Sequence, residues 1–465
     1  MVQNTPFDTI AAISTPPGEG GIGIVRISGE RAFDITKKIF VPRRKKKQNL
    51  WGGSFIMHLG YIKENNRTVD EVLVSIMKAP RTYTREDMVE INCHGGPVAV
   101  REVLRVVISR GARMAEPGEF TRRAFINGRI DLSQAEAVLD IVRARTGRAL
   151  ETAVNQLKGQ LGQKIIQLVQ LLRETLVVLE ANIDFPEEED VEAVEKNRIR
   201  EKILQVHSQL EELIASYGRG KMVKEGVLTV LSGKPNVGKS SILNAFVRFE
   251  RAIVTSIPGT TRDVIEEQLN LNGIPFILAD TAGITESTDL IEKEGVSRSR
   301  SYMQRAQLVL LVFDANAPLD QMDLDIARRA AHKRHITVIN KIDLPRKLDL
   351  DLLFSKTKID PNPVYLSATH GTGLDELQKK MSEAVISGEA GGDYSVMITS
   401  LRHYNILKKA QSELDYALKS LDQKMGPELT AFDVRNAMDL LGEITGKVTS
   451  KDILKDIFNN FCIGK

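Results

Sequence analysis

The segment that most constrains the fold of this chain is Gly233-Lys-Pro-Asn-Val-Gly-Lys-Ser240, which fits the pattern Gly-x-x-x-x-Gly-Lys-Ser/Thr. It follows an apolar, strand-like run, Val227–Leu231, and precedes a helix-like run, Ser241–Phe246. Glycines let the backbone N–H groups of such a loop approach phosphate oxygens closely, and the helix that follows adds a favourable dipole. We therefore predict a phosphate-binding loop in which Lys239 reaches the β- and γ-phosphates and Ser240 binds Mg²⁺.

Two further segments follow in the order that a sheet binding a mononucleotide requires. Ile257-Pro-Gly-Thr-Thr-Arg262 is a loop in which a switch threonine, Thr260 or Thr261, is expected to meet Mg²⁺. Asp280-Thr-Ala-Gly283 ends the strand-like run Ile274–Ala279. This position would bring a carboxylate near Mg²⁺ and a glycine N–H near the γ-phosphate.

The last two segments indicate which base is bound. Asn340-Lys-Ile-Asp343 ends the strand-like run Ile336–Ile339, and Ser367-Ala-Thr369 follows Val364–Leu366. Guanine offers two adjacent N–H donors that an acceptor-only carboxylate such as Asp343 matches, whereas adenine does not, so we predict GTP over ATP. The candidate GTP-binding residues are Asn236, Val237, Gly238, Lys239, Ser240, Ser241, Thr255, Ser256, Ile257, Pro258, Gly259, Thr260, Thr261, Asp280, Thr281, Ala282, Gly283, Asn340, Lys341, Asp343, Ser367, Ala368 and Thr369.

The residue after Gly283 departs from a common pattern. Ras-like GTPases place a water-orienting glutamine there, but this chain has Ile284, so hydrolysis needs another device. Glu292 could orient the water, or it could be a solvated residue of a helix in Asp289–Glu294. The chemistry of the residues alone favours the second interpretation.

Length and composition set wider bounds. The 465 residues allow about three domains, and a net charge of +3 does not indicate a dedicated nucleic-acid binder. Two cysteines, Cys93 and Cys462, are too few for a disulfide framework, and the strongly apolar run Leu308–Phe313 is too short to cross a membrane. We therefore expect a cytoplasmic protein that has no membrane partner.

The texture of the sequence changes along the chain. Short apolar runs and turns to about residue 118 predict an α+β domain. Ser133-Gln-Ala-Glu136 has the form of a capping box and begins a long helical stretch, while Tyr217-Gly-Arg-Gly220 is typical of a linker. A βαβ alternation then runs to about residue 385, before the helical period returns at Leu401. We predict a multidomain α+β and α/β protein: an N-terminal α+β domain, then a helical domain that carries an inserted P-loop domain with a mostly parallel, Ras-like sheet. A separate C-terminal helical domain is the alternative.

Several segments together resemble the MnmE (TrmE) family of tRNA-modification GTPases over essentially the whole chain. They include Asn236, the segment Thr255-Ser-Ile-Pro-Gly-Thr-Thr261, the stretch Pro16–Arg26, His94-Gly-Gly-Pro97 and the terminal Cys462-Ile-Gly-Lys465. The resemblance implies an N-terminal folate-binding and dimerisation domain at 1–118 and a helical domain at 119–220 and 386–465. It implies an inserted G domain at 221–385.

The resemblance also implies how GTP is hydrolysed. The protein would be a homodimer whose G domains meet across the nucleotide, with K⁺ in place of an arginine finger. The implied K⁺ ligands are Asn236, Thr255, Ile257 and Thr260, with Ile257 able to offer only its backbone carbonyl. Ser240 and Thr261 would hold Mg²⁺. The implied catalytic residues are Glu292, which would orient the attacking water, and Lys239 of the phosphate loop.

By the same resemblance, the enzyme modifies C5 of the wobble uridine of certain tRNAs by aminomethyl or carboxymethylaminomethyl addition. It would form a heterotetramer with MnmG (GidA), which carries FAD, while a reduced folate of the 5,10-methylenetetrahydrofolate or 5-formyltetrahydrofolate type supplies the carbon. The implied folate-binding residues are Arg26, Glu90, Arg129 and Lys465, and Cys462 would lie near the modification site. Whether its thiol reacts or packs stays open.

One alternative concerns the function and another the basic run near residue 45. A regulatory or ribosome-assembly GTPase would use the same nucleotide motifs without modification chemistry, but it has no need of a folate pocket. The basic run Arg43–Lys47 is either a solvated loop or, with arginines between Arg110 and Arg148, a contact for tRNA phosphates.

Overall fold

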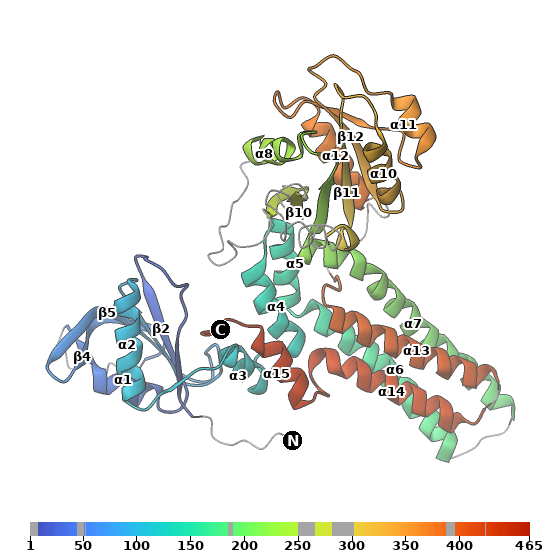
Figure 1. Ribbon diagram of the computed structural model, residues 1–465. Helices are drawn as coiled ribbons and strands as arrows, with labels where there is room; N and C mark the ends of the chain where they lie inside the picture. The colour runs from blue at the N-terminus through green and yellow to red at the C-terminus, as the bar shows by residue number, and fades with distance from the viewer. Residues whose placement is uncertain are drawn as a thin grey trace. The chain divides into compact units, whose positions relative to one another are not determined.

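The computed structural model describes residues 8–43, 51, 53–184, 189–249, 266–280, 302–386, 396–423 and 425–465 (Figure 1). The chain divides into two compact units. The first comprises Met1–Val142, Val154–Leu210 and Asn405–Lys465, and the second Arg143–Ala153 and Glu211–Tyr404. The first unit holds an α+β part and a helical part, and most of the second is inserted between its segments, so the fold is the multidomain class expected from the sequence.

A mixed sheet forms the N-terminal part of the first unit, with the strand order β3-β4-β5-β6-β2-β1-β7. Alternating residues of the central strands, among them Val25, Ile27, Val89 and Ile91, are buried in one core with helices α1 and α2. The intervening residues therefore face the other side of the sheet. The elements are β1 (Ile10–Ile13), β2 (Gly23–Ser28), α1 (Ala32–Ile39), β3 (Phe40–Pro42), β4 (Ile56–Glu64), β5 (Arg67–Met77), β6 (Met88–Cys93), α2 (Pro97–Ser109) and β7 (Arg113–Met114).

Helices make up the rest of the first unit, and α6 (Gln160–Asp184) packs along α14 (Pro427–Thr445). The remaining helices are α3 (Glu119–Ile126), α4 (Leu132–Arg143), α5 (Gly147–Leu157), α7 (Glu189–Glu225), α13 (Leu401–Asp422) and α15 (Lys451–Asn459), of which α5, α7 and α13 run into the second unit.

The capping box expected at Ser133 lies two residues earlier. The N–H of Gln134 donates to Asp131 Oδ1 at 2.8 Å, and the N–H of Asp131 donates to Gln134 Oε1 at 2.9 Å. Asp131 therefore caps α4, and Ser133, which lies inside the helix, is fully buried. Ser133 Oγ instead donates to Asp131 Oδ1 at 2.7 Å, so the serine supports the cap without being it.

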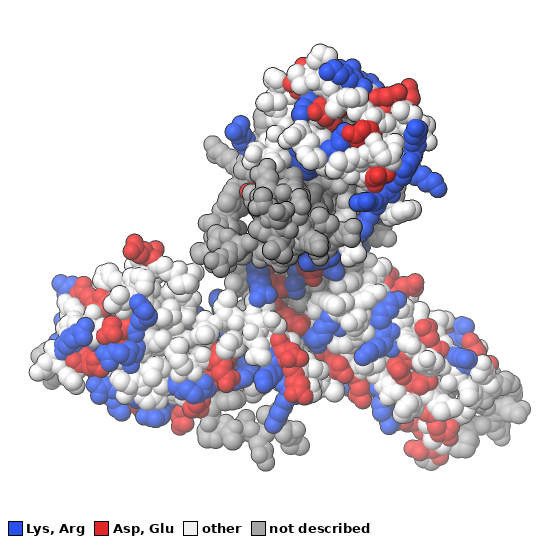
Figure 2. Space-filling view, in the orientation of Figure 1, with Lys and Arg blue, Asp and Glu red and all other residues white. Residues whose placement is uncertain are grey.

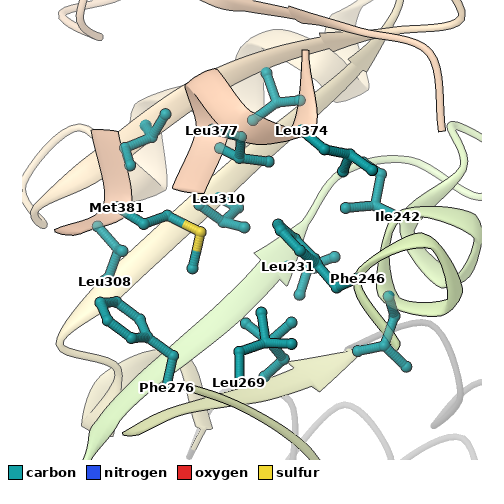
Figure 3. Close-up of a cluster of buried hydrophobic side chains, with 14 of the residues drawn as sticks. Leu231, Ile242, Phe246, Leu269, Phe276, Leu308, Leu310, Leu374, Leu377 and Met381 are labelled. Atoms are coloured by element: carbon teal, nitrogen blue, oxygen red, sulfur yellow. The ribbon is translucent and has the colours of Figure 1, made fainter. Parts of the chain in front are cut away.

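The second unit contains a six-stranded sheet in the order β13-β12-β11-β8-β10-β9, parallel except for β9. The expected strands and the helix after Ser240 are confirmed. Figure 3 shows side chains from strands and helices of this unit, such as Leu231, Phe246 and Leu377, meeting in one apolar core. The elements are β8 (Val227–Ser232), α8 (Lys239–Phe249), β9 (Glu266–Leu271), β10 (Ile274–Asp280), β11 (Leu308–Asp314), α10 (Gln321–Ala330), β12 (His335–Asn340), α11 (Leu350–Lys356), β13 (Val364–Leu366) and α12 (Leu374–Ile386).

The predicted linker Tyr217–Gly220 is wrong, because these residues lie inside α7. The ring of Tyr217 stacks on that of Tyr404 with 4.4 Å between centroids. A Cβ at Gly220 would lie 2.1 Å from the carbonyl oxygen of Ile398, so this glycine allows a close approach of two backbones within the second unit. Glycine is favoured both in a linker turn and where a helix closely contacts another backbone, so the local sequence alone does not distinguish a linker from a closely packed helix.

Acidic and basic side chains alternate over the face shown in Figure 2, as the small net charge suggests. Arg43 pairs with Glu71 at 3.4 Å, and the rest of the run to Lys47 lies outside the described residues. Contact of this run with tRNA stays a prediction. Among the helices of the described ranges, none is both long and apolar enough to cross a bilayer.

Candidate functional site

The loop between β8 and α8 has the shape expected of a phosphate-binding loop. Asn236 has φ +64° and Gly238 has φ +94°, both in the left-handed region. A Cβ at Gly233 would lie 2.3 Å from the carbonyl oxygen of Val312, and one at Gly238 would lie 2.2 Å from Asn340 Nδ2. Larger side chains at these two glycines would therefore displace the loop from the neighbouring strands β11 and β12.

The ammonium of Lys239 is held by the loop itself. Lys239 Nζ donates to the carbonyl oxygens of Gly233 at 2.9 Å and Lys234 at 2.7 Å, and the residue is buried. Ser240 and Ser241 follow in the first turn of α8, where free N–H groups at a helix N-terminus favour an anion. Lys239 thus lies at the position from which a P-loop lysine reaches phosphate oxygens.

The segment after β12 is tied to this loop. Asn340 is buried; its Nδ2 donates to the carbonyl oxygen of Val237 at 2.9 Å, and its Oδ1 accepts from the N–H of Ala368 at 3.1 Å. Lys341 Nζ donates to the carbonyl oxygen of Asn236 at 2.7 Å and pairs with Asp314 at 2.6 Å. The predicted phosphate and base segments therefore form one connected site, in which Asn340 and Lys341 position the two loops.

Asp343 carries the carboxylate that was predicted to accept hydrogen bonds from the base. Ser367 Oγ donates to Asp343 Oδ1 at 2.7 Å, and His370 Nδ1 lies 3.0 Å from the same hydroxyl. The hydrogen bond from Ser367 holds the pKa of Asp343 below its usual value, helped by a backbone N–H and by the nearby His370 and Lys341. The lowered pKa favours the carboxylate form of Asp343, which is the form that the predicted contact with guanine requires. Thr369 is exposed in the turn after Ser367.

Other predicted residues lie wholly or partly outside the described residues. Asp280 is the last residue of β10, as expected, but its side chain lies outside the described residues. The described ranges likewise exclude Thr255, Ser256, Ile257, Pro258, Gly259, Thr260, Thr261, Thr281, Ala282, Gly283 and Glu292. Within those ranges, no group of three or more His, Cys, Asp and Glu side chains could hold a metal ion.

A second cluster lies in the first unit, around two residues expected to bind folate. Arg26 on β2 stands opposite Glu90 on β6 in the sheet register. Arg26 Nε and Nη2 both approach Glu90 Oε1, at 2.9 and 2.8 Å, and Arg26 Nη1 donates to the carbonyl oxygen of Gly464 at 3.2 Å. This arrangement leaves Glu90 Oε2 outside the ion pair, in an orientation that Arg26 fixes.

Aromatic rings complete this cluster. The guanidinium carbon of Arg26 lies 5.6 Å from the ring centroids of both Tyr83 and Phe120, and that of Arg129 lies 4.4 Å from the Tyr83 ring. Tyr83 Oη and Thr121 Oγ1 are 2.9 Å apart. The two cations thus share one aromatic ring, which lowers the cost of holding like charges together. Tyr83 and Phe120 were not predicted, since isolated aromatic residues are usually core residues.

The chain terminus docks on the same side of the first unit. The N–H of Phe120 donates to the carbonyl oxygen of Lys465 at 3.2 Å, and that of Gly118 to Cys462 at 3.4 Å. Phe458 and Phe461 are buried in one cluster with α3 and α4. Through Gly464 the terminal segment reaches Arg26, so the backbone of Lys465 lies next to a residue that contacts Glu90, although most of the chain separates them. Cys462 is exposed.

A cavity of about 820 Å³ borders the terminal segment. Its walls come from the glycine-rich loop after β1, the first turns of α2 and Ile463. The volume suits a small organic ligand. None of the four expected folate residues is among those that line it.

Known proteins resemble the chain along its length. The family described as "GTP-binding protein TrmE N-terminus" matches residues 9–129, and that described as "MnmE helical domain" matches residues 132–462. The G domain of T. maritima FeoB is 26% identical; the match covers 34% of this chain and 98% of that one, with a TM-score of 0.26.

Full-length relatives are more similar. The protein named tRNA modification GTPase MnmE of Geobacillus kaustophilus is 46% identical over 99% of this chain and all of its own length. The protein of that name from Carboxydothermus hydrogenoformans is 47% identical over 98% of this chain and 99% of its own. Identity at this level over whole chains shows common descent, and the chain belongs to the MnmE family of tRNA modification GTPases.

Proposed function

We propose that this chain hydrolyses GTP and acts in the modification of tRNA. The observation that carries the proposal is the connected nucleotide site, in which Asn340 and Lys341 join the phosphate loop to the loop that presents Asp343. Hydrogen bonding by Ser367 keeps Asp343 ionised and oriented. A carboxylate of this kind accepts both N–H groups of the guanine edge, and adenine lacks that pair of donors.

Phosphate binding falls to the loop and α8. Lys239 would exchange its two carbonyl partners for the β- and γ-phosphates, and the hydroxyl of Ser240 suits Mg²⁺, together with Thr261. The amide oxygen of Asn236 suits K⁺, with Thr255, Ile257 and Thr260 as further ligands. K⁺ would offset the negative charge that develops on the phosphate oxygens, and Glu292 would orient the attacking water. Asn236 lies in the phosphate loop, which supports its role.

The cluster around Arg26 is proposed to bind a reduced folate, which supplies the one-carbon unit when bound. Glu90 would accept the adjacent N–H groups of the pterin edge, and Arg26 would hold the Glu90 carboxylate in place. Arg129 and Lys465 offer positive charge for the folate carboxylates. Their convergence within one unit supports the assignment. Cys462 would lie near the modified base.

The wider reaction needs partners. We propose a cytoplasmic homodimer that joins an FAD-carrying protein, MnmG, in a heterotetramer and modifies C5 of the wobble uridine of certain tRNAs. We also propose the domain limits 1–118, 119–220 with 386–465, and 221–385 for the folate-binding, helical and G domains.

Exchanging the base tests the nucleotide site. Asp343→Asn is expected to weaken GTP binding at least about a hundredfold. The variant is also expected to bind xanthosine triphosphate, since the asparagine amide can donate a hydrogen bond to the oxygen that xanthine carries in place of the guanine amino group. Turnover of the unchanged chain should be much faster in K⁺ than in Na⁺ at equal ionic strength. Equal rates in the two salts would remove the K⁺ assignment, and unaltered base preference in the variant would remove Asp343.

The modification itself has a separate test. Mass spectrometry of wobble uridines from cells that lack the protein is expected to show loss of the aminomethyl-type group at C5. Intact modification in those cells would favour a regulatory GTPase that carries the same nucleotide site.

A further inference from the structure

Lys234, the second residue of the phosphate loop, has a side chain that leaves the loop. Its Nζ lies 2.9 Å from Asp320 Oδ2 and 2.7 Å from Asp323 Oδ2, at the start of α10. The side chain of Lys234 is 15% exposed and that of Asp323 only 4%. An ammonium so placed has both carboxylates as partners.

The two carboxylates are themselves fixed. The N–H of Asp323 donates to Asp320 Oδ1 at 3.1 Å, and the N–H of Asp320 donates to Asp323 Oδ2 at 3.3 Å, which forms a reciprocal capping box. α10 in turn buries Leu324, Ala327 and Ala330 in a core that includes residues of β11. Lys234 is thus anchored to a helix end that is packed on the sheet.

The charges of this group are mutually supporting. Burial lowers the pKa of Lys234, but the hydrogen bonds and charges of Asp320 and Asp323 outweigh burial, and the net shift is upward. Two carboxylates one helical turn apart repel each other, and the ammonium between them offsets that repulsion. The hydrogen bond from Lys234 lowers the pKa of Asp320, whereas burial raises the pKa of Asp323 despite the same ammonium.

The backbone of Lys234 connects this anchor to nucleotide binding. The carbonyl oxygens of Lys234 and Gly233 are the acceptors that hold Lys239 Nζ. Asn340 and Lys341 fix the other half of the loop, at the carbonyls of Val237 and Asn236. The contact of Lys234 with α10 fixes the first half, where the loop leaves β8.

We propose that Lys234, Asp320 and Asp323 form a latch that holds the phosphate loop in its binding shape, with Lys234 a positioning residue rather than a phosphate ligand. This inference rests on the proposed nucleotide site and adds three residues to it. A preorganised loop loses less conformational freedom when phosphate binds.

Lys234→Met tests the latch, because methionine keeps most of the side-chain length and removes the charge. Affinity for a fluorescent GDP and the KM for GTP are expected to weaken about three- to tenfold, with little change in kcat. Lys234→Arg should restore affinity. Arg328→Ala is the matched control, because it breaks an exposed ion pair with Asp325 on the same helix, at 3.4 Å.

Asp320→Asn and Asp323→Asn test the other side of the latch. Asparagine can still cap α10, so the helix start is retained while the charge is lost. Each is expected to weaken GDP binding, and the combination of Lys234→Met with Asp323→Asn should weaken it less than the sum of the two single effects.

Two results would overturn the latch. Lower thermal stability with unchanged GDP affinity in Lys234→Met would mean that the ion pairs only stabilise α10. Weaker binding in Lys234→Met with unchanged or tighter binding in both aspartate variants would make Lys234 a phosphate ligand. If instead the proposed nucleotide site is wrong, Asp343→Asn would leave the affinity for GDP unaltered, which distinguishes that outcome from failure of the latch.

Discussion

Gly464→Ala is expected to release the chain terminus from the N-terminal sheet. Gly464 has φ +95°, and a Cβ there would lie 2.2 Å from the carbonyl oxygen of Ile13, a backbone atom held in β1. The carbonyl oxygen of Gly464 accepts hydrogen bonds from Arg26 and from Ser14 Oγ, each at 3.2 Å. Alanine therefore cannot occupy this position without displacing the segment that carries Lys465.

The magnitude follows from these contacts. A left-handed conformation costs an alanine about 1–2 kcal/mol. The hydrogen bond from the charged Arg26 contributes about 1.5–3 kcal/mol and the one from Ser14 about 1 kcal/mol. Together these amount to about 3–6 kcal/mol, which shifts the balance between docked and released terminus at least about a hundredfold.

Digestion by a carboxypeptidase specific for C-terminal lysine and arginine measures this balance directly. We expect Lys465 to be released at least about tenfold faster from Gly464→Ala than from the unchanged chain, and we expect the affinity for a reduced folate to fall. Gly218→Ala is the matched control, because Gly218 lies in α7 with open space around its Cβ position. Equal release of Lys465 from all three chains would refute the reasoning.

Further predictions concern the first unit. Phe458→Ala removes a ring that is 2% exposed and should lower the free energy of unfolding by about 3–5 kcal/mol in urea denaturation; an effect below about 1 kcal/mol would contradict its place in the core. Arg123→Met removes a buried cation, 1% exposed, that pairs with Glu119 at 3.0 Å and with Glu86 at 3.1 Å. Because Glu119 keeps Arg113 at 2.8 Å, the loss should cost about 1–3 kcal/mol by the same assay, whereas breaking the exposed pair of Lys37 with Asp34 should cost less than about 1 kcal/mol. Burial, with the charge of Asp70, raises the pKa of Cys93 from 9.0 to about 11. As the pH rises, the thiol of the unfolded chain therefore loses its proton before that of the folded chain, and the free energy of unfolding should fall by about 2 kcal/mol between pH 9 and 11. Cys93→Ala should make the free energy of unfolding less dependent on pH in this range. A thiol reagent at neutral pH should accordingly modify Cys462 in the native protein and Cys93 only after unfolding.

Local patterns predicted the elements of the second unit well. The strand at Val364–Leu366 has the expected bounds, β8 is longer than expected by one residue at its end, and β12 is longer by one residue at each end. These strands are short apolar runs between turn residues, and each is followed by a polar motif, so the pattern marks both ends.

Local patterns failed where distant contacts decide the structure. Tyr217–Gly220 has the composition of a linker, yet Tyr404 and Ile398 cover it, and it continues α7. That helix is favoured only once these packing partners are present. The cap of α4 is a different failure, because Asp131 and Gln134 form a capping box of purely local contacts two residues before the expected one.

By itself the sequence determined the kind of site, since the order of glycines, lysine and carboxylates along the second unit is a chemical requirement of binding a guanine nucleotide. Only the tertiary structure decided which residues support it. The latch from Lys234 to Asp320 and Asp323, and the terminus that carries Gly464 to Arg26, join segments distant in the chain. Such contacts leave no local pattern, because their energy comes from charges and backbone groups that meet only after the chain has folded.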